Sequence, residues 1–353
     1  MTATVAPKTP ATATTAALLT PEEIRAKVAT LPRIPFAFVP TPLEEAPKLA
    51  AALGGPRMLF KRDDLTGFAF GGNKVRALEF RMADARAKGC DAFTVTNIGQ
   101  SNHARLHSAA CTRLGMKMVI VKPSPADEEV TGNLLLDRML GVEIVEAHGR
   151  KVDEALDEVD KRLRAEGYTP YHSTREPFSR LAGTVAYLEA SIELRDQLRA
   201  AGVDTQRAHL FLVHGTSAAG LALGGKLLGT GWRVHAVSVG GTYDAIVKME
   251  LDLSGRVADL LGLPARLEPG EFDVHDKYVG ERYGDAAPWV LEAIKLAART
   301  DAIFTDPVYT GKSLSGMIGE IRAGAVPKED MAVFIHTGGL PIIFAYHEKL
   351  KDL

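Results

Sequence analysis

The sequence predicts an α/β fold with mainly parallel sheets, divided into more than one domain. The first observation is size. The chain has 353 residues, 46% of them hydrophobic, which is enough for a large core and suggests two domains. The second is that, from about residue 90 onward, short apolar runs alternate with amphipathic stretches of about 10 to 15 residues. Such alternation is typical of βαβ units, whose strands lie parallel.

Charge, hydropathy and cysteine content exclude several classes of protein. The formal net charge of −2 leaves no basic surplus for binding nucleic acid. No apolar run approaches the roughly 20 residues that span a bilayer. Cys90 and Cys111 lie in helix-like or core-like sequence, which fits reduced thiols better than a disulfide framework. We therefore expect a cytoplasmic protein whose partners are neither nucleic acid nor a membrane.

The ordered part of the chain is expected to begin near residue 19. Residues 1–18 are rich in Thr, Ala and Pro and hold no arginine, which predicts a disordered tail and not a signal or transit peptide. The segment "TPEE" then predicts the start of a helix. Thr20 can cap this helix, Pro21 fits its first turn, and Glu23 completes a capping box.

The remaining elements follow in order. Between residues 91 and 166 three apolar runs predict strands, and the segment after each of them predicts a helix. The strands are expected at 91–97, 117–123 and 142–147, and the helices at 101–115, 131–141 and about 151–166. Further segments continue the alternation at 209–215, 221–229, 233–240, 288–300, 302–306 and 331–339.

Three of the strand ends are rich in small and polar residues: 97–103, 214–221 and 336–339. In open α/β sheets, ligands bind beyond the carboxyl ends of the strands. The turn "GTSAAG" at 215–220 is the best candidate for a phosphate site, because it can present backbone N–H groups at the positive end of a helix. The alternative is that this turn simply connects a strand to a helix.

Other motifs are incomplete. The tripeptide "GKS" at 311–313 matches the end of a Walker A loop, but Asp306 stands where the first glycine belongs. His103 and His107 have the i, i+4 spacing of zinc ligands, but no glutamate follows His103. We interpret the two histidines as one polar helix face and predict no metal site.

Lys74 is the remaining candidate, in "GFAFGGNKVRALEF" at 67–80. It could be a solvated residue in the first turn of a helix, although a cation there opposes the helix dipole. A lysine beside glycines, together with a phosphate cradle and hydroxyl groups at strand ends, is typical of an enzyme that holds pyridoxal phosphate (PLP) through an imine.

Four segments in the same order resemble one known family. They are "LFKRDDLTGFAFGGNKVRALEF" (59–80), "GQSNHARLHSAACTRLGM" (99–116), "DPVYTGKSLSGMI" (306–318) and "HTGGLPIIFAY" (336–346). Together they resemble the fold-type-II PLP enzymes, in the branch of D-cysteine desulfhydrase and 1-aminocyclopropane-1-carboxylate (ACC) deaminase. The resemblance implies a two-domain, three-layer αβα fold like that of the tryptophan synthase β subunit, and a homodimer. A large cofactor-binding domain would comprise 19–76 and 183–353, with a small α/β domain, 77–182, inserted into it.

The resemblance also implies roles for individual residues. Lys74 would form the imine with the cofactor, and Ser101, Tyr283 and Tyr309 would be catalytic. Asn102 would hydrogen-bond the ring oxygen of the cofactor, and Thr337, with Thr310 close by, would lie near its ring nitrogen. The phosphate would be bound by Gly215, Thr216, Ser217, Ala218, Ala219 and Gly220.

The same resemblance favours one activity. Tyr309 is followed by Thr310, as in the desulfhydrase type, whereas the deaminase type tends to have glutamate there. This predicts α,β-elimination from D-cysteine to pyruvate, ammonia and sulfide. The alternatives are ACC ring opening, a related lyase such as a cysteate sulfo-lyase, a PLP-binding protein without catalysis, and a nucleotide-binding protein that uses the "GKS" loop. The segments "STREPFSRLAG" (173–183) and "HGTSAAGL" (214–221) depart from the family pattern on the substrate side.

Overall fold

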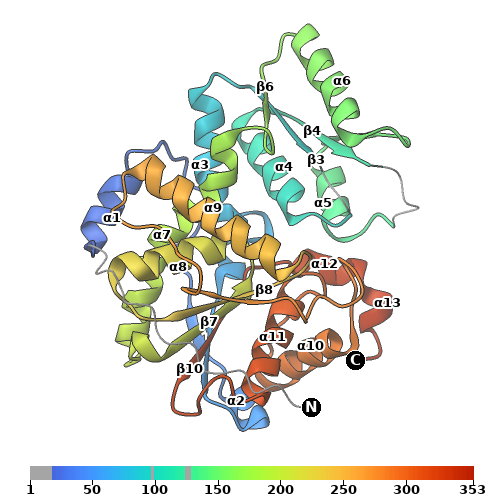
Figure 1. Cartoon of the computed structure of the whole chain (residues 1–353). Helices are drawn as coiled ribbons and strands as arrows, with labels where there is room; N and C mark the ends of the chain where they lie inside the picture. Colours follow the sequence, from blue (N-terminus) through green and yellow to red (C-terminus); the bar gives the residue numbers. More distant parts are fainter. Residues whose placement is uncertain (1–17, 97–98, 124–128) are drawn as a thin grey trace.

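The computed structural model describes residues 18–96, 99–123 and 129–353, and the strands form two sheets (Figure 1). The larger sheet has six strands, which are, in spatial order, β1 (Leu43–Glu45), β2 (Arg57–Lys61), β10 (Met331–Ile335), β7 (Ala208–Val213), β8 (Arg233–Val237) and β9 (Asp273–His275). Only β1 runs antiparallel to its neighbour, and the other pairs are parallel. The fold is thus α/β with mainly parallel sheets, as predicted.

The smaller sheet has four parallel strands. In spatial order they are β5 (Glu143–Glu146), β4 (Lys117–Lys122), β3 (Ala92–Thr96) and β6 (Pro170–His172). All four lie inside the segment 77–182, which supports our proposal that this segment is an inserted domain. The predicted tail at 1–18 lies, except for its last residue, outside the described residues, and so do positions 97 and 98 of the first strand end.

Helices cover both faces of each sheet. They are α1 (Pro21–Val28), α2 (Pro47–Leu53), α3 (Lys74–Ala87), α4 (Asn102–Leu114), α5 (Gly132–Met139), α6 (Val152–Ala165), α7 (Pro177–Ala200), α8 (Thr216–Leu228), α9 (Tyr243–Leu261), α10 (Pro288–Asp301), α11 (Thr310–Arg322), α12 (Leu340–Ala345) and α13 (His347–Leu350). Three short 3-10 turns lie at Asp63–Leu65, Phe68–Phe70 and Thr205–Arg207.

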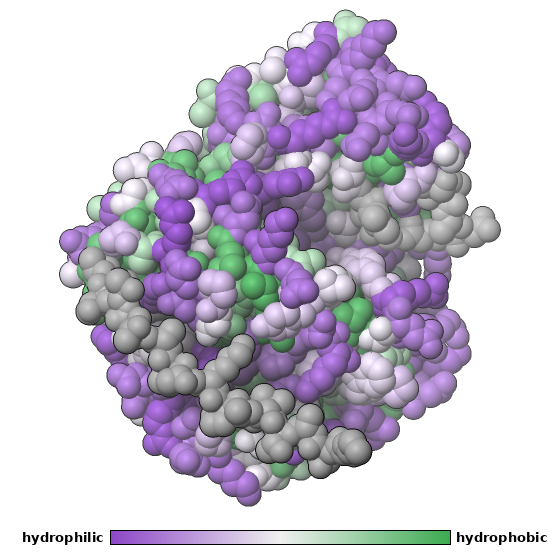
Figure 2. Space-filling view, in the orientation of Figure 1, coloured by the Kyte–Doolittle hydropathy of each residue, from purple (hydrophilic) through white to green (hydrophobic). Residues whose placement is uncertain are grey.

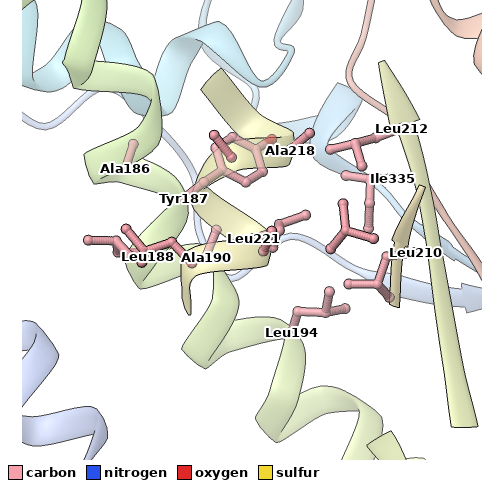
Figure 3. Close-up of a cluster of buried hydrophobic side chains, with 14 of the residues drawn as sticks. Ala186, Tyr187, Leu188, Ala190, Leu194, Leu210, Leu212, Ala218, Leu221 and Ile335 are labelled. Atoms are coloured by element: carbon pink, nitrogen blue, oxygen red, sulfur yellow. The ribbon is translucent and has the colours of Figure 1, made fainter. Parts of the chain in front are cut away.

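The core follows from the two-residue period of the strands. On β7, Leu210 and Leu212 point into a cluster formed with α7, α8 and α9, whereas Phe211 points into the opposite cluster, formed with α2, α10 and α11. Figure 3 shows the first cluster, in which Leu221 of α8 lies between α7 and the sheet. Because both faces of the strands are buried, the strands read as continuous apolar runs in the sequence.

Three predictions made from short stretches of the sequence are confirmed. Thr20 and Glu23 form the predicted capping box at the start of α1. Gly115 ends α4 in the left-handed conformation, with φ of 70°. Cys90 and Cys111 are both free thiols.

The apolar segment 302–306 forms no strand, which corrects the predicted alternation. Ala302 ends α10 in a left-handed conformation with φ of 55°, so the chain turns away from a straight course at once. The carbonyl of Phe304 accepts a hydrogen bond from the ring of His336 at 2.7 Å, and no neighbouring strand pairs with it. The segment leads instead to Asp306, whose side chain shapes the next turn.

The face of the molecule drawn in Figure 2 is mainly hydrophilic. None of the helices in the described ranges is both long enough and apolar enough to cross a bilayer.

Candidate active site

A cavity of about 250 Å³ lies beyond the carboxyl ends of β7 and β10. Its walls come from all three of the predicted strand ends and from the amino end of α3. The lining residues are Asn73, Lys74, Ala77, Arg81, Asn102, His103, Gly183, Val213, His214, Thr216, Ser217, Val239, Tyr309, Thr337 and Gly338. The cavity therefore brings together six of the residues that the sequence predicted for the site: Lys74, Asn102, Thr216, Ser217, Tyr309 and Thr337.

Lys74 is the first residue of α3 and borders the cavity. Its Nζ lies 5.5 Å from the centre of the Tyr309 ring. Burial, together with the charges of Arg81 and Arg105, lowers the pKa of Lys74 to about 8, although Asp306 acts in the opposite direction. The amine is therefore more easily deprotonated than an ordinary lysine, which is what nucleophilic chemistry at nitrogen requires.

The backbone around Lys74 is fixed by close contact with the segment after β10. Gly72 has φ of 114°, and a Cβ at Gly338 would lie 2.7 Å from the Cα of Gly72. The N–H of Asn73 donates to the carbonyl of Thr337 at 3.0 Å. Because Gly72 has no side chain, the segment before α3 can lie against the segment after β10.

The amino end of α8 opens into the cavity. Gly215 is the N-cap, with φ of 112° and no side chain to cap the helix. Thr216 and Ser217 line the cavity. The first N–H groups of a helix have no partner within it, so the turn offers free donors and a positive dipole end to an anion.

The other half of the predicted phosphate turn lies elsewhere. Ala218 and Ala219 are fully buried in the core, and a Cβ at Gly220 would lie 2.4 Å from the Cβ of Tyr187 on α7. Figure 3 shows Ala218 beside Tyr187. The structure therefore places Ala218, Ala219 and Gly220 in the packing between α7 and α8, and not along the cavity.

Two polar residues near this turn were not predicted. Asn73 donates from Nδ2 to the hydroxyl of Ser217 at 2.8 Å, which joins the lysine segment to α8. Glu250 of α9 is fully buried, and its Oε1 accepts from the N–H of Gly215 at 3.0 Å. Burial raises the pKa of Glu250 to about 8, against the effect of that hydrogen bond.

The amino end of α4 carries Ser101 and Asn102. Ser101 is the N-cap, and its Oγ accepts from the N–H of Ala104 at 3.1 Å; it does not line the cavity. Asn102 does line the cavity, and its Oδ1 accepts from Nδ2 of Asn133 at 3.0 Å. Its amide nitrogen end is therefore the part that remains to meet a ligand.

Tyr309 and Tyr283 form a pair. Their hydroxyl groups are hydrogen-bonded to each other, and the rings meet edge to face with centres 6.0 Å apart. Tyr309 lines the cavity, whereas Tyr283 is 47% exposed and borders a neighbouring cavity of about 340 Å³. Burial raises the pKa of both phenols, so both are neutral near pH 7.

The turn before α11 is organised by Asp306, a residue that was not among those predicted for the site. Its carboxylate accepts from the backbone N–H groups of Val308 and Tyr309, both at 2.8 Å, and from the Thr310 hydroxyl at 2.7 Å. Thr310 is fully buried and does not line the cavity. Of the two threonines predicted near the cofactor ring, only Thr337 borders the cavity.

Two other motifs are part of the core. Lys312 of the "GKS" tripeptide is fully buried in α11, and its Nζ donates to the carbonyls of Val279 and Arg282 at 2.5 and 3.2 Å. His107 is fully buried and stacks on Phe93, so the interpretation of a polar helix face is wrong for it. Within the described ranges, no group of three His, Cys, Asp or Glu side chains is placed to hold a metal ion.

Solved structures and curated proteins resemble this chain over nearly its whole length. A crystal structure of an ACC deaminase homologue superposes with a TM-score of 0.82 at 30% identity, covering 94% of this chain and 98% of that one. The ACC deaminase of Methylobacterium nodulans is 34% identical over 331 residues, which are 89% of this chain and 96% of the relative. That of Rhizobium leguminosarum bv. viciae is 32% identical over 337 residues, or 91% and 97% of the two chains.

The family model described as "Pyridoxal-phosphate dependent enzyme" matches residues 34–338, a range that contains every cavity-lining residue. This range also covers both sheets. The chain therefore belongs to the family of pyridoxal-phosphate-dependent enzymes, as a lyase or deaminase whose cofactor is PLP.

Proposed function

We propose that this enzyme opens the ring of ACC and releases ammonia and 2-oxobutanoate. The proposal is supported by the relatives described above, which are named ACC deaminases and share about a third of their residues with this chain over about nine-tenths of its length. The single observation that carries it is the cavity in which the amine of Lys74 faces the ring of Tyr309. This reverses the order of the two activities expected from the sequence, where D-cysteine came first.

The cavity fits the cofactor. The uncapped amino end of α8 suits a phosphate group, and a Cβ at Gly183 would lie 2.2 Å from Oγ1 of Thr216, so no side chain could stand at that position of α7. We propose that Thr216 and Ser217 hold the phosphate, Lys74 the aldehyde carbon, and Asn102 and Thr337 the ring. When bound, PLP supplies an electron sink for the bonds of the substrate α carbon.

The side chains around this space have matching proton chemistry. With its lowered pKa, the Lys74 amine can take a proton near neutral pH, from a ring methylene of ACC or from the α carbon of D-cysteine. The neutral phenol of Tyr309, held by Tyr283, can donate a hydrogen bond into the cavity. We propose Lys74 as the base and Tyr309 as the residue that orients the substrate, with Tyr283 acting through Tyr309.

D-cysteine elimination remains the second candidate, and one observation favours it. Among the described residues, no carboxylate lines the cavity. Thr310, at the position where the deaminase type tends to have glutamate, instead binds Asp306. An elimination that expels sulfide needs no carboxylate at this point, because hydrosulfide is a good leaving group.

One assay separates the candidates. The PLP-loaded enzyme is incubated with ACC, D-cysteine and L-cysteate in parallel, and 2-oxo acid, ammonia and sulfide are measured, with Lys74→Ala as the matched inactive control. We expect 2-oxobutanoate from ACC. Pyruvate and sulfide from D-cysteine without turnover of ACC would replace the proposal by the second candidate, and no 2-oxo acid from any of the three would reject both.

We also propose a homodimer in a reducing compartment. The rings of Phe38 and Phe70 are 73% and 61% exposed, and a partner chain could cover them. The two free thiols suit a cytoplasm. Light scattering on the purified protein tests the assembly, and a monomeric mass at micromolar concentration would contradict it.

A further inference from the structure

Arg81 is a buried cation without an acidic partner. It is 8% exposed and lines the cavity. Its Nε donates to the carbonyl of Ser179 at 2.7 Å, but its Nη1 is buried and has no hydrogen-bond partner. Within the described ranges no Asp or Glu forms an ion pair with it, and burial lowers its pKa to about 10. An uncompensated buried charge is costly, so its presence at a ligand cavity requires an explanation.

The side chain of Arg81 lies toward the amino end of α8. Ser179, which holds its Nε, is one helical turn before Gly183 on α7. Gly183 in turn abuts Thr216, the first residue of α8. Arg81, Gly183 and Thr216 all line the cavity, and the hydrogen bond to Ser179 holds Arg81 beside the segment of α7 that abuts Thr216.

Several helices bring their amino ends to the cavity, and among them α4 and α8 differ in how they are capped. The amino end of α4 is capped by the side chain of Ser101. The amino end of α8 is preceded by Gly215 and has no side-chain cap. A guanidinium next to uncapped N–H groups forms a site for a phosphate, whose oxygens accept several donors at once.

We propose that Arg81 is the cationic ligand of the cofactor phosphate and completes the cradle formed by the first turn of α8. The phosphate then supplies the negative charge that no Asp or Glu among the described residues provides to the guanidinium. Ala77, one turn before Arg81 on the same stripe of α3, leaves the path of that side chain open. This inference goes beyond the proposed function, and it holds for either substrate.

The test compares two cofactor forms. Pyridoxal has the same aldehyde as PLP but no phosphate, so the ratio of the two dissociation constants isolates the phosphate interaction. Both constants are measured by equilibrium dialysis on cofactor-free wild type, Arg81→Met and Arg86→Met. Arg86 is an exposed arginine on the same helix and serves as the control. We expect Arg81→Met to weaken PLP binding about 10- to 100-fold and to leave pyridoxal binding and the control unchanged.

Other results would overturn the proposal. Equal weakening of PLP and pyridoxal would mean that Arg81 only shapes the cavity. Unchanged PLP binding with a raised KM for the amino acid would assign Arg81 to the substrate carboxylate. Two controls distinguish loss of phosphate binding from damage to the fold. Arg81→Lys keeps a cation and should keep part of the preference for PLP over pyridoxal. Inorganic phosphate should stabilise the cofactor-free wild type and Arg86→Met against unfolding, but not Arg81→Met. The binding and stability readouts do not use turnover, so they stand whether or not ACC is the substrate.

Discussion

The two faces of α3 differ in whether their buried charged side chains form ion pairs. On one face, Arg76 binds Asp63 and Glu193 at 2.8 and 3.0 Å, and Glu79 accepts from Arg33 and two backbone N–H groups. On the other face, Lys74 and Arg81 line the cavity, and neither has a carboxylate in an ion pair among the described residues. Residues two positions apart on a helix point in nearly opposite directions, so a single helix serves both purposes.

The paired charges of Arg76 and Glu79 stabilise the fold, whereas the charges of Lys74 and Arg81 face the cavity and can bind a ligand. A buried ion pair whose members are all hydrogen-bonded is expensive to break but has no further chemistry to offer. Burying a cation whose N–H donors are unpaired costs free energy, and a bound anion removes that cost. The cavity face of α3 therefore has the composition of a binding site, although both faces carry similar residues.

The largest effect is expected at Lys74. Lys74→Ala removes the amine that holds the cofactor, so formation of 2-oxo acid should fall by about 10³-fold or more, and the visible absorption of the lysine-bound cofactor should disappear. The ligand-free variant should unfold at the same urea concentration as wild type, because the lost charge had no partner. Full activity with the absorption band intact would contradict the assignment.

Arg76→Met tests the other face. It leaves Asp63 and Glu193 buried without their cation, so urea unfolding of the ligand-free protein should show a loss of about 3 to 5 kcal/mol. Arg81→Met should cost much less or be neutral in the same assay, since it removes an unpaired charge. Equal losses from the two variants would remove the distinction between the faces.

Glu250 extends the comparison to an acid near the cavity. Its carboxyl titrates near 4.5 when unfolded and about 8 when folded, so between these values the folded protein keeps a proton that the unfolded chain has lost. The stability of the wild type should therefore fall as pH rises from 4.5 to 8. Glu250→Gln keeps an acceptor for the N–H of Gly215 and should be more stable than wild type at pH 8, by about 1 to 3 kcal/mol. Parallel pH profiles of the two proteins would show that Glu250 is not protonated in the fold.

The smallest effect concerns Ser101. As a helix cap, its replacement in Ser101→Ala should cost about 1 kcal/mol, and Ser101→Gly only a few tenths. If capping is its only role, Ser101→Gly should keep the kcat/KM of wild type. A large fall in kcat/KM for both variants would show contact with the substrate, as the family resemblance implies.

The site could be located from the sequence because its key residues lie in short motifs, two of which, those of Asn102 and Thr337, follow strand ends. Lys74, Asn102, Tyr309 and Thr337 each follow a recognisable local pattern, and all four border the cavity. The extent of the phosphate turn was not predictable from small residues alone. They suit both a ligand contact and close helix packing, and Gly220 serves the second purpose.

The residues that were missed depend on contacts between distant segments. Glu250 reaches Gly215 across 35 positions, which no local pattern can indicate. Asp306 was considered only as an obstacle to a Walker A loop, although a buried Asp three residues before a tyrosine suits a turn that binds backbone N–H groups. A signal for Arg81 did exist, because it stands seven residues, or two turns, after Lys74 and must share its helix face.

The position of β10 sets an order of events for the nascent protein. β10 lies between β2 and β7, in the middle of the larger sheet, although it is the last strand of the chain. The contact between Gly72 and Gly338 closes the cavity from the same segment. A ribosome-bound chain that has not yet emerged past residue 338 thus lacks both the middle of its sheet and one wall of its cavity. We therefore expect loading with cofactor to follow the emergence of residue 338 from the ribosome.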